Sequence, residues 1–120
     1  MSMQLKLTTT VVDGILVVHC AGRIVFGEES GYLRDNVKKY ISEHKKIVLD
    51  LAQVTYIDSG GLGTLVGLYT SARNNGSAIK LSSLTERVGE LLQVTKLVTV
   101  FEVYDSPRDA VEAYKKGAAA

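Results

Sequence analysis

The first twenty-two residues have the pattern of two β-strands joined by a tight turn. Polar and apolar residues alternate over residues 4–12, and residues 15–22 (ILVVHCAG) are almost all apolar. Asp13-Gly14, which lies between these segments, is a typical two-residue hairpin turn. The pattern therefore predicts an antiparallel hairpin at the start of the fold.

Four later segments have apolar residues at the spacing of an amphipathic helix. They are residues 27–44, 59–74, 82–97 and a final segment that begins at Ser106-Pro107. Asn and Gly in RNNG (73–76) favour a helix end, and Ser106 with Pro107 favours a helix start. Ser82 or Ser83 is the predicted cap of the third helix, with Glu86 completing a capping box with Ser83.

Three further segments separate these helices and are predicted to be strands. Residues 45–57 are the most apolar and β-branched, which predicts a central strand covered on both faces. Residues 77–83 and 98–104 are the other two. The order ββαβαβαβα predicts an α/β fold, with a mixed, mostly parallel sheet, an N-terminal antiparallel hairpin and amphipathic helices. We expect one domain over residues 1–117 and a disordered tail at 118–120.

Composition narrows the possible partners and the cellular compartment. The 14 basic and 13 acidic residues nearly cancel and form no block of like charge, which argues against nucleic acid as a partner. No apolar run approaches the ~20 residues that span a bilayer, so we expect no membrane insertion and a cytoplasmic protein. The single cysteine, Cys20, is expected to be a small buried residue, and no ligand cluster predicts a metal or cofactor.

The junction VTYIDSGGLGTLVGLY (54–69) places polar and glycine residues between the central strand and a helix. In a parallel sheet, functional groups gather at the carboxyl ends of strands, and a helix N-terminus there favours a negative group. Asp58 and Ser59 are also common helix caps, so a purely structural role stays open. Three glycines in four positions exceed what a cap needs, which favours close approach of a partner.

Known catalytic motifs do not fit this junction. A phosphate-binding Walker loop needs a lysine after its last glycine, and none follows Gly63. A nucleophile elbow needs glycine where Ile57 stands. A hydrolase that uses Ser59 would need His19 or His44 within hydrogen-bond reach. We therefore expect that the protein is not an enzyme, and nucleotide binding by the glycine-rich turn stays open.

Residues 47–69 (IVLDLAQVTYIDSGGLGTLVGLY) resemble the signature of STAS domains, the family of bacterial anti-sigma factor antagonists. The resemblance extends from the hairpin through GRI (22–24) to LLQVTKL (91–97) and VFEVYDSPRDAVEAY (100–114). It covers nearly the whole chain. The resemblance implies a phosphorylation-switched binding module that regulates transcription.

In that family, an anti-sigma factor that is itself a GHKL-type serine kinase phosphorylates the serine of the Asp-Ser pair, and a PP2C-type phosphatase removes the phosphate. Carried over to this sequence, Ser59 is the acceptor. The unphosphorylated form would bind the anti-sigma factor and so release a sigma factor. The implied partner-binding residues are Asp58, Ser59, Gly60, Gly61, Leu62, Gly63 and Thr64.

One position departs from the family pattern. Many antagonists carry an acidic residue after the second strand, where this sequence has Val25, and Glu28 and Glu29 follow a few residues later. The departure leaves a second interpretation open. The chain would then be a STAS module that is never phosphorylated and that acts as a signalling scaffold or as a soluble subunit of a lipid- or anion-transport system.

Overall fold

The computed structural model describes residues 3–117, which form a five-stranded mixed sheet in the order β1-β2-β3-β4-β5. The first two strands pair antiparallel, and the later strands pair in parallel. This confirms the predicted hairpin and the α/β class. The strands are β1 (Leu5–Val12), β2 (Ile15–Ile24), β3 (Lys46–Ile57), β4 (Ala78–Ser82) and β5 (Val103–Tyr104).

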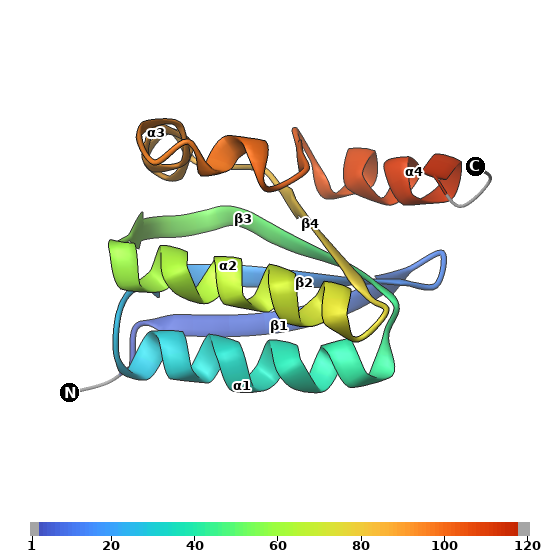
Figure 1. Ribbon diagram of the computed structural model, residues 1–120, viewed down its shortest axis with the longest axis horizontal. Helices are drawn as coiled ribbons and strands as arrows, with labels where there is room; N and C mark the ends of the chain where they lie inside the picture. The colour runs from blue at the N-terminus through green and yellow to red at the C-terminus, as the bar shows by residue number, and fades with distance from the viewer. Residues whose placement is uncertain (1–2, 118–120) are drawn as a thin grey trace.

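Four α-helices cover the sheet on its two faces. Helices α1 and α2 lie side by side against one face and run in the same direction, and α4 packs on the opposite face (Figure 1). The N-terminal ends of α1 and α2 lie at the carboxyl ends of the parallel strands, where the predicted site is (Figure 1). The helices are α1 (Glu28–Glu43), α2 (Ser59–Asn74), α3 (Glu86–Val94) and α4 (Pro107–Gly117).

Two hydrophobic cores lie on opposite faces of the sheet. Alternate residues of β2 point to each: Leu16 and Val18 belong to the larger core, whereas Ile15 and Val17 belong to the smaller. The helix residues of the larger core include Leu33, Val37, Ile41, Leu62, Leu65, Leu68, Ala72, Val88 and Leu92. Those of the smaller core are Ala110, Val111 and Tyr114.

The prediction that the central strand is covered on both faces holds only for its first half. Val48 of β3 is buried in the smaller core beneath α4, but Ala52, Gln53 and Thr55 are exposed. The eleven-residue helix α4 is too short to follow the twelve-residue strand along its whole length. The second half of β3 is therefore open on that face.

The predicted strand over residues 98–104 is wrong for most of its length. Only Val103 and Tyr104 form β5, and residues 97–99 form a short 3₁₀ helix after Lys96, whose φ is 63°. Phe101 is nonetheless buried, with its ring 5.5 Å from that of Tyr69 in an edge-on contact. Packing on Tyr69 of α2, rather than strand pairing, therefore accounts for the burial of Phe101.

The predicted cap of the third helix is also wrong. Thr85 is the N-cap of α3, and its hydroxyl accepts a hydrogen bond from the Val88 amide. Ser83 adopts a left-handed φ of 61° and donates its amide to the Tyr104 carbonyl instead. The cap of the last helix is confirmed, because the Ser106 hydroxyl accepts from the Asp109 amide at 3.1 Å.

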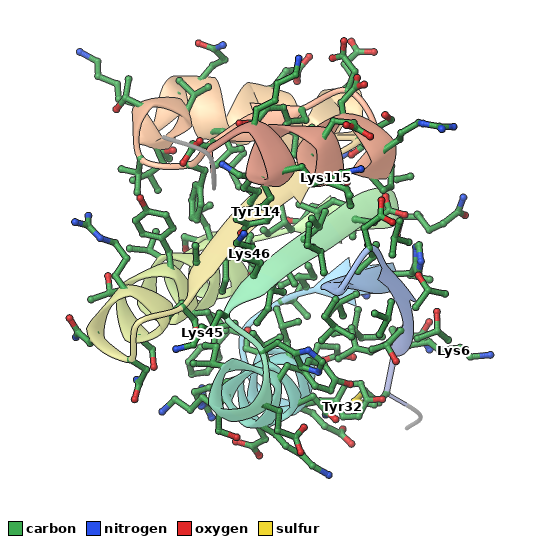
Figure 2. All side chains as sticks on the ribbon, turned by 90° about the vertical axis from the view of Figure 1, so that its right-hand side faces the viewer. Lys6, Tyr32, Lys45, Lys46, Tyr114 and Lys115 are labelled. Carbon is green, nitrogen blue, oxygen red and sulfur yellow. The ribbon has the colours of Figure 1, made fainter. Side chains whose placement is uncertain are left out.

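Polar contacts attach α4 and β5 to the sheet at the end of the molecule away from the start of α2. The Tyr114 hydroxyl donates to the carbonyl of Ile47 at 2.8 Å, and the amine of Lys80 donates to the Glu102 carboxylate at 2.6 Å. Figure 2 views this end, with Tyr114 and Lys115 on α4 above Lys46. The proposed tail at 118–120 lies outside the described residues. Among the helices of residues 3–117, none combines the length and apolarity needed to cross a bilayer.

Candidate functional site

Asp58 joins two loops at the carboxyl ends of β2 and β3. As N-cap of α2, its carboxylate accepts a hydrogen bond from the Gly61 amide at 2.7 Å. The same carboxylate accepts from the Phe26 amide, with both oxygens 3.1 Å from that nitrogen. The predicted capping role is therefore confirmed, and Asp58 additionally holds the loop between β2 and α1 against the start of α2.

Ser59 is the first residue of α2, and its side chain is exposed. Within residues 3–117, its hydroxyl makes no hydrogen bond to another residue. The unpaired amides of the first helical turn give this position a positive partial charge. The hydroxyl is thus accessible from solvent and lies where an added negative charge is favoured.

Gly60 and Gly61 allow another segment of the same chain to pack closely against α2. A Cβ atom on Gly60 would lie 2.6 Å from the Cβ of Phe26, and one on Gly61 would overlap the carbonyl oxygen of Ile24. Both contacts come from the segment that leads from β2 into α1. The segment that approaches these two glycines closely is therefore part of the same chain, and no partner is needed to explain them.

The remaining residues of the predicted surface point in different directions. Leu62 is buried in the larger core, whereas Gly63 is exposed and nothing lies within 4 Å of a Cβ built on it. Thr64 is half-buried and donates its hydroxyl to the Gly60 carbonyl at 3.1 Å. The outward-facing part of the predicted surface therefore consists mainly of Ser59 and Gly63, with Thr64 at its edge.

The fold and this junction agree with a known family. A family model described as STAS domain matches residues 6–110. The chain belongs to the STAS domain family. An anti-sigma-B factor antagonist of Listeria monocytogenes is 33% identical over 84 residues, which cover 66% of this chain and 74% of that protein.

Other relatives extend over more of this STAS domain. An anti-sigma F factor antagonist of Paenibacillus polymyxa is 25% identical over 111 residues, which cover 91% of this chain and 94% of that protein. The crystal structure of a Thermotoga maritima protein, described as a candidate anti-sigma factor antagonist, superposes with a TM-score of 0.81 at 26% identity. The superposed region covers 89% of this chain and 92% of the Thermotoga maritima chain.

The histidines of this STAS domain do not contact Ser59. The Nδ1 atom of His19 lies 2.8 Å from the Asp50 carboxylate, and its Nε2 atom lies 3.1 Å from the Thr10 hydroxyl, so its ring bridges three strands. His44 ends α1, at the opposite end of the sheet from Ser59. The arrangement that a serine hydrolase requires is therefore not present among the described residues.

Cys20 is buried, as predicted, and burial raises the pKa of its thiol to about 12. A thiol with so high a pKa stays protonated at neutral pH and is a poor nucleophile. Within residues 3–117, no group of three or more histidine, cysteine or acidic side chains is placed to hold a metal ion.

Glu28 and Glu29, the acidic residues that follow Val25, have different surroundings. The Glu29 carboxylate accepts a hydrogen bond from the Gln4 amide at 2.8 Å, and this bond lowers the pKa of Glu29. Glu28 is exposed in the first turn of α1. The carbonyl of Val25 accepts from both the amide and the hydroxyl of Ser30, so the backbone at Val25 serves to start α1.

Sequence reasoning missed Phe26 as a residue of the site. Its side chain is 81% exposed, directly beside Gly60, and its amide is bound to Asp58. A large aromatic residue between Val25 and Gly27, in a loop of otherwise small and acidic residues, was the available signal. An exposed phenylalanine next to the candidate acceptor serine is a natural contact for a protein partner.

Proposed function

We propose that this STAS domain is an anti-sigma factor antagonist, switched by phosphorylation of Ser59. The observation that carries the proposal is the exposed Ser59 hydroxyl at the first position of α2, beside the Asp58 carboxylate. The names of the relatives support the same role. The proposed partners are an anti-sigma factor of the GHKL serine-kinase type, which phosphorylates Ser59, and a PP2C-type phosphatase, which removes the phosphate.

The switch would act through local charge. A phosphate adds roughly −1.5 to −2 charges next to Asp58, whose carboxylate is fixed by hydrogen bonds to Gly61 and Phe26. The amides of the first turn of α2 offset part of this charge, so we expect the fold to stay unchanged. A partner that fits the neutral serine would have to desolvate a dianion beside a carboxylate. A penalty of about 3 kcal/mol weakens binding more than a hundredfold.

In the unphosphorylated state, the surface around Ser59 would bind the anti-sigma factor and so release its sigma factor. The neighbouring Phe26 supplies an exposed apolar contact, and Gly63 leaves the outer side of α2 open to close approach. Phosphorylation would end the complex through electrostatic repulsion and desolvation. The sequence of events therefore needs no rearrangement of the sheet or helices.

Phosphate transfer is the direct test of the acceptor. The purified protein is incubated with the anti-sigma kinase and ATP, and the modified residue is identified by peptide mass spectrometry. We expect one phosphate, on Ser59, and none on Ser59→Ala. Labelling at another residue, or undiminished labelling of Ser59→Ala, would show that the acceptor is wrong.

Charge mimicry tests the electrostatic part of the proposal. We expect Ser59→Asp to keep the circular dichroism spectrum of the wild type and to bind the anti-sigma factor at least tenfold more weakly. Gln93→Glu, which adds the same charge at an exposed position on α3, is the control and should bind as the wild type does. Equal affinities of all three proteins would contradict the mechanism.

A further inference from the structure

A groove of about 630 Å³ runs between α1 and α2, away from Ser59. Its walls come from the two parallel helices, which lie side by side on the same face of the sheet (Figure 1). The exposed side chain of Phe26 stands at the end nearest Ser59, and Ser71 lines the other end. Ser71 lies twelve positions after Ser59, which corresponds to ~18 Å along α2.

One wall of the groove carries two positive charges. Arg34 and Lys38 lie four residues apart on α1, line the groove and are exposed. Considering residues 3–117, neither side chain has an acidic partner within ion-pair distance. Side chains four residues apart on a helix have Cβ atoms ~6 Å apart, so this wall offers two cations at the spacing of one helical turn.

The opposite wall lacks side chains where an ordinary helix would have them. Gly63 and Gly67 line the groove, and nothing lies within 4 Å of a Cβ built on either. Unlike Gly60 and Gly61, they make no room for another part of the chain. Glycine within a helix is less stable than alanine, so their presence in α2 has no explanation in the fold itself. Together with Thr64 and Ser71 they leave a shallow surface along which another backbone can lie closely.

Two of the three hydroxyl residues that line the groove, Ser30 and Thr64, already use their hydroxyl groups within the chain. Ser30 donates its hydroxyl to the Val25 carbonyl at 2.7 Å, and Thr64 donates to the Gly60 carbonyl at 3.1 Å. Within the described residues, a small polar ligand would therefore find few free donors beyond the two cations and the Ser71 hydroxyl. The shape and charge of the groove fit an elongated, negatively charged occupant better than a compact one.

We propose that this groove is a second docking surface for the protein partner and that it receives an acidic amphipathic helix of that partner. The helix would lie along Gly63 and Gly67, with carboxylates at four-residue spacing opposite Arg34 and Lys38, and with an apolar residue against Phe26. The proposal rests on the proposed function for the identity of the partner, and it adds the chemistry of the segment that the partner presents.

The test places a photo-crosslinking residue, p-benzoylphenylalanine, at Ser71 of the full chain. At this distance from Ser59, a partner bound only at the tip of α2 does not reach it. The crosslinked protein in an extract of the source cell is identified by mass spectrometry, and the crosslinked peptide is mapped. We expect an acidic helical segment of the anti-sigma factor. A basic or extended segment, a second copy of this chain, or no crosslink would overturn the proposal.

Affinity measurements with the purified crosslinked partner give the second readout. We expect Gly67→Leu, which fills the groove, to weaken binding roughly tenfold. The control Gly89→Leu, at a helical glycine on α3 with equally open surroundings, should have no effect. Lys38→Glu should weaken binding at low salt and much less at high salt, and Lys39→Glu, which does not line the groove, should not. Equal effects of each variant and its control would also overturn the proposal.

The two proposals fail separately. A crosslink to an acidic helix of a protein that is not an anti-sigma factor would support the groove and contradict the proposed function. If the affinity for the anti-sigma factor falls with Ser59→Asp but does not change with Gly67→Leu or Lys38→Glu, the result would support the proposed function. It would contradict the proposal that the groove is a docking surface.

Discussion

Gly61 and Gly63 are two residues apart in α2 and have opposite surroundings. A methyl group on Gly61 would overlap the Ile24 carbonyl oxygen, whereas one on Gly63 would meet nothing within 4 Å. We therefore expect Gly61→Ala to lower the free energy of unfolding by about 2–3 kcal/mol. Gly63→Ala should raise it by about 0.5–1 kcal/mol, because alanine is favoured over glycine within a helix.

Urea denaturation followed by circular dichroism measures both changes. The two variants carry the same added methyl group in the same helix, so each is the control for the other. Similar unfolding midpoints would mean that the segment between β2 and α1 yields easily and does not hold the start of α2 in place.

These residues also show what could be predicted at the site. The cap at Asp58 follows from local preference and was confirmed. The role of Gly60 and Gly61 did not follow, because the atoms they make room for belong to Ile24 and Phe26, more than thirty residues earlier in the chain. Contacts between such distant segments depend on the register of β2 and β3, which a single sequence does not reveal.

At the scale of elements, β4 and β5 are linked by a pH-sensitive pair. The hydrogen bond from Lys80 lowers the pKa of Glu102 below its ordinary value of 4.5. Burial alone would lower the pKa of Lys80, but its hydrogen bonds with Glu102 and Tyr104 outweigh this effect and raise it. Both groups are therefore charged at neutral pH.

The sign of the pH dependence follows from the direction of the shift. Because the folded state holds Glu102 ionised more strongly than the unfolded state does, the stabilisation is present above pH 4.5 and is lost as the pH falls through the lower folded-state pKa. We expect Glu102→Gln to be less stable than the wild type at pH 7 and to approach it under acidic conditions. Thermal unfolding between pH 7 and pH 3 measures this difference. A constant difference across that range would mean that the ionisation of Glu102 does not contribute.

Predictions of elements failed where tertiary packing overrode local preference. Residues 98–104 are rich in β-branched side chains, but the left-handed Lys96 turns the chain, and Phe101 packs on Tyr69 instead of pairing in the sheet. The third helix begins later than its capping-box pattern indicated, because Ser83 is held by the Tyr104 carbonyl. Long periodic segments such as α1 and α2 were predicted to within a residue or two, since one buried face determines them.

At the scale of the molecule, the sheet separates two cores of unequal size. The larger is covered by α1, α2 and α3 and has the candidate binding surface outside α1 and α2, whereas the smaller is covered by α4 alone. Elements that bury little apolar surface open more easily than the rest of a domain. We therefore expect α4 to detach without unfolding α1 and α2, and Val111→Ala to leave the affinity for the partner unchanged.

Native-state hydrogen exchange tests this separation. In the wild type, the amides of α4 should exchange with a lower opening free energy than those of α1 and α2. Leu33→Ala removes a fully buried side chain from the larger core and should lower the opening free energy of α1 and α2 by about 2–5 kcal/mol. The opening free energy of α4 should not change, because Leu33 stays packed in the state in which only α4 is detached. An equal decrease in all three helices would show that the two cores unfold as one unit. In that case, a change beneath α4 would also reach the surface around Ser59.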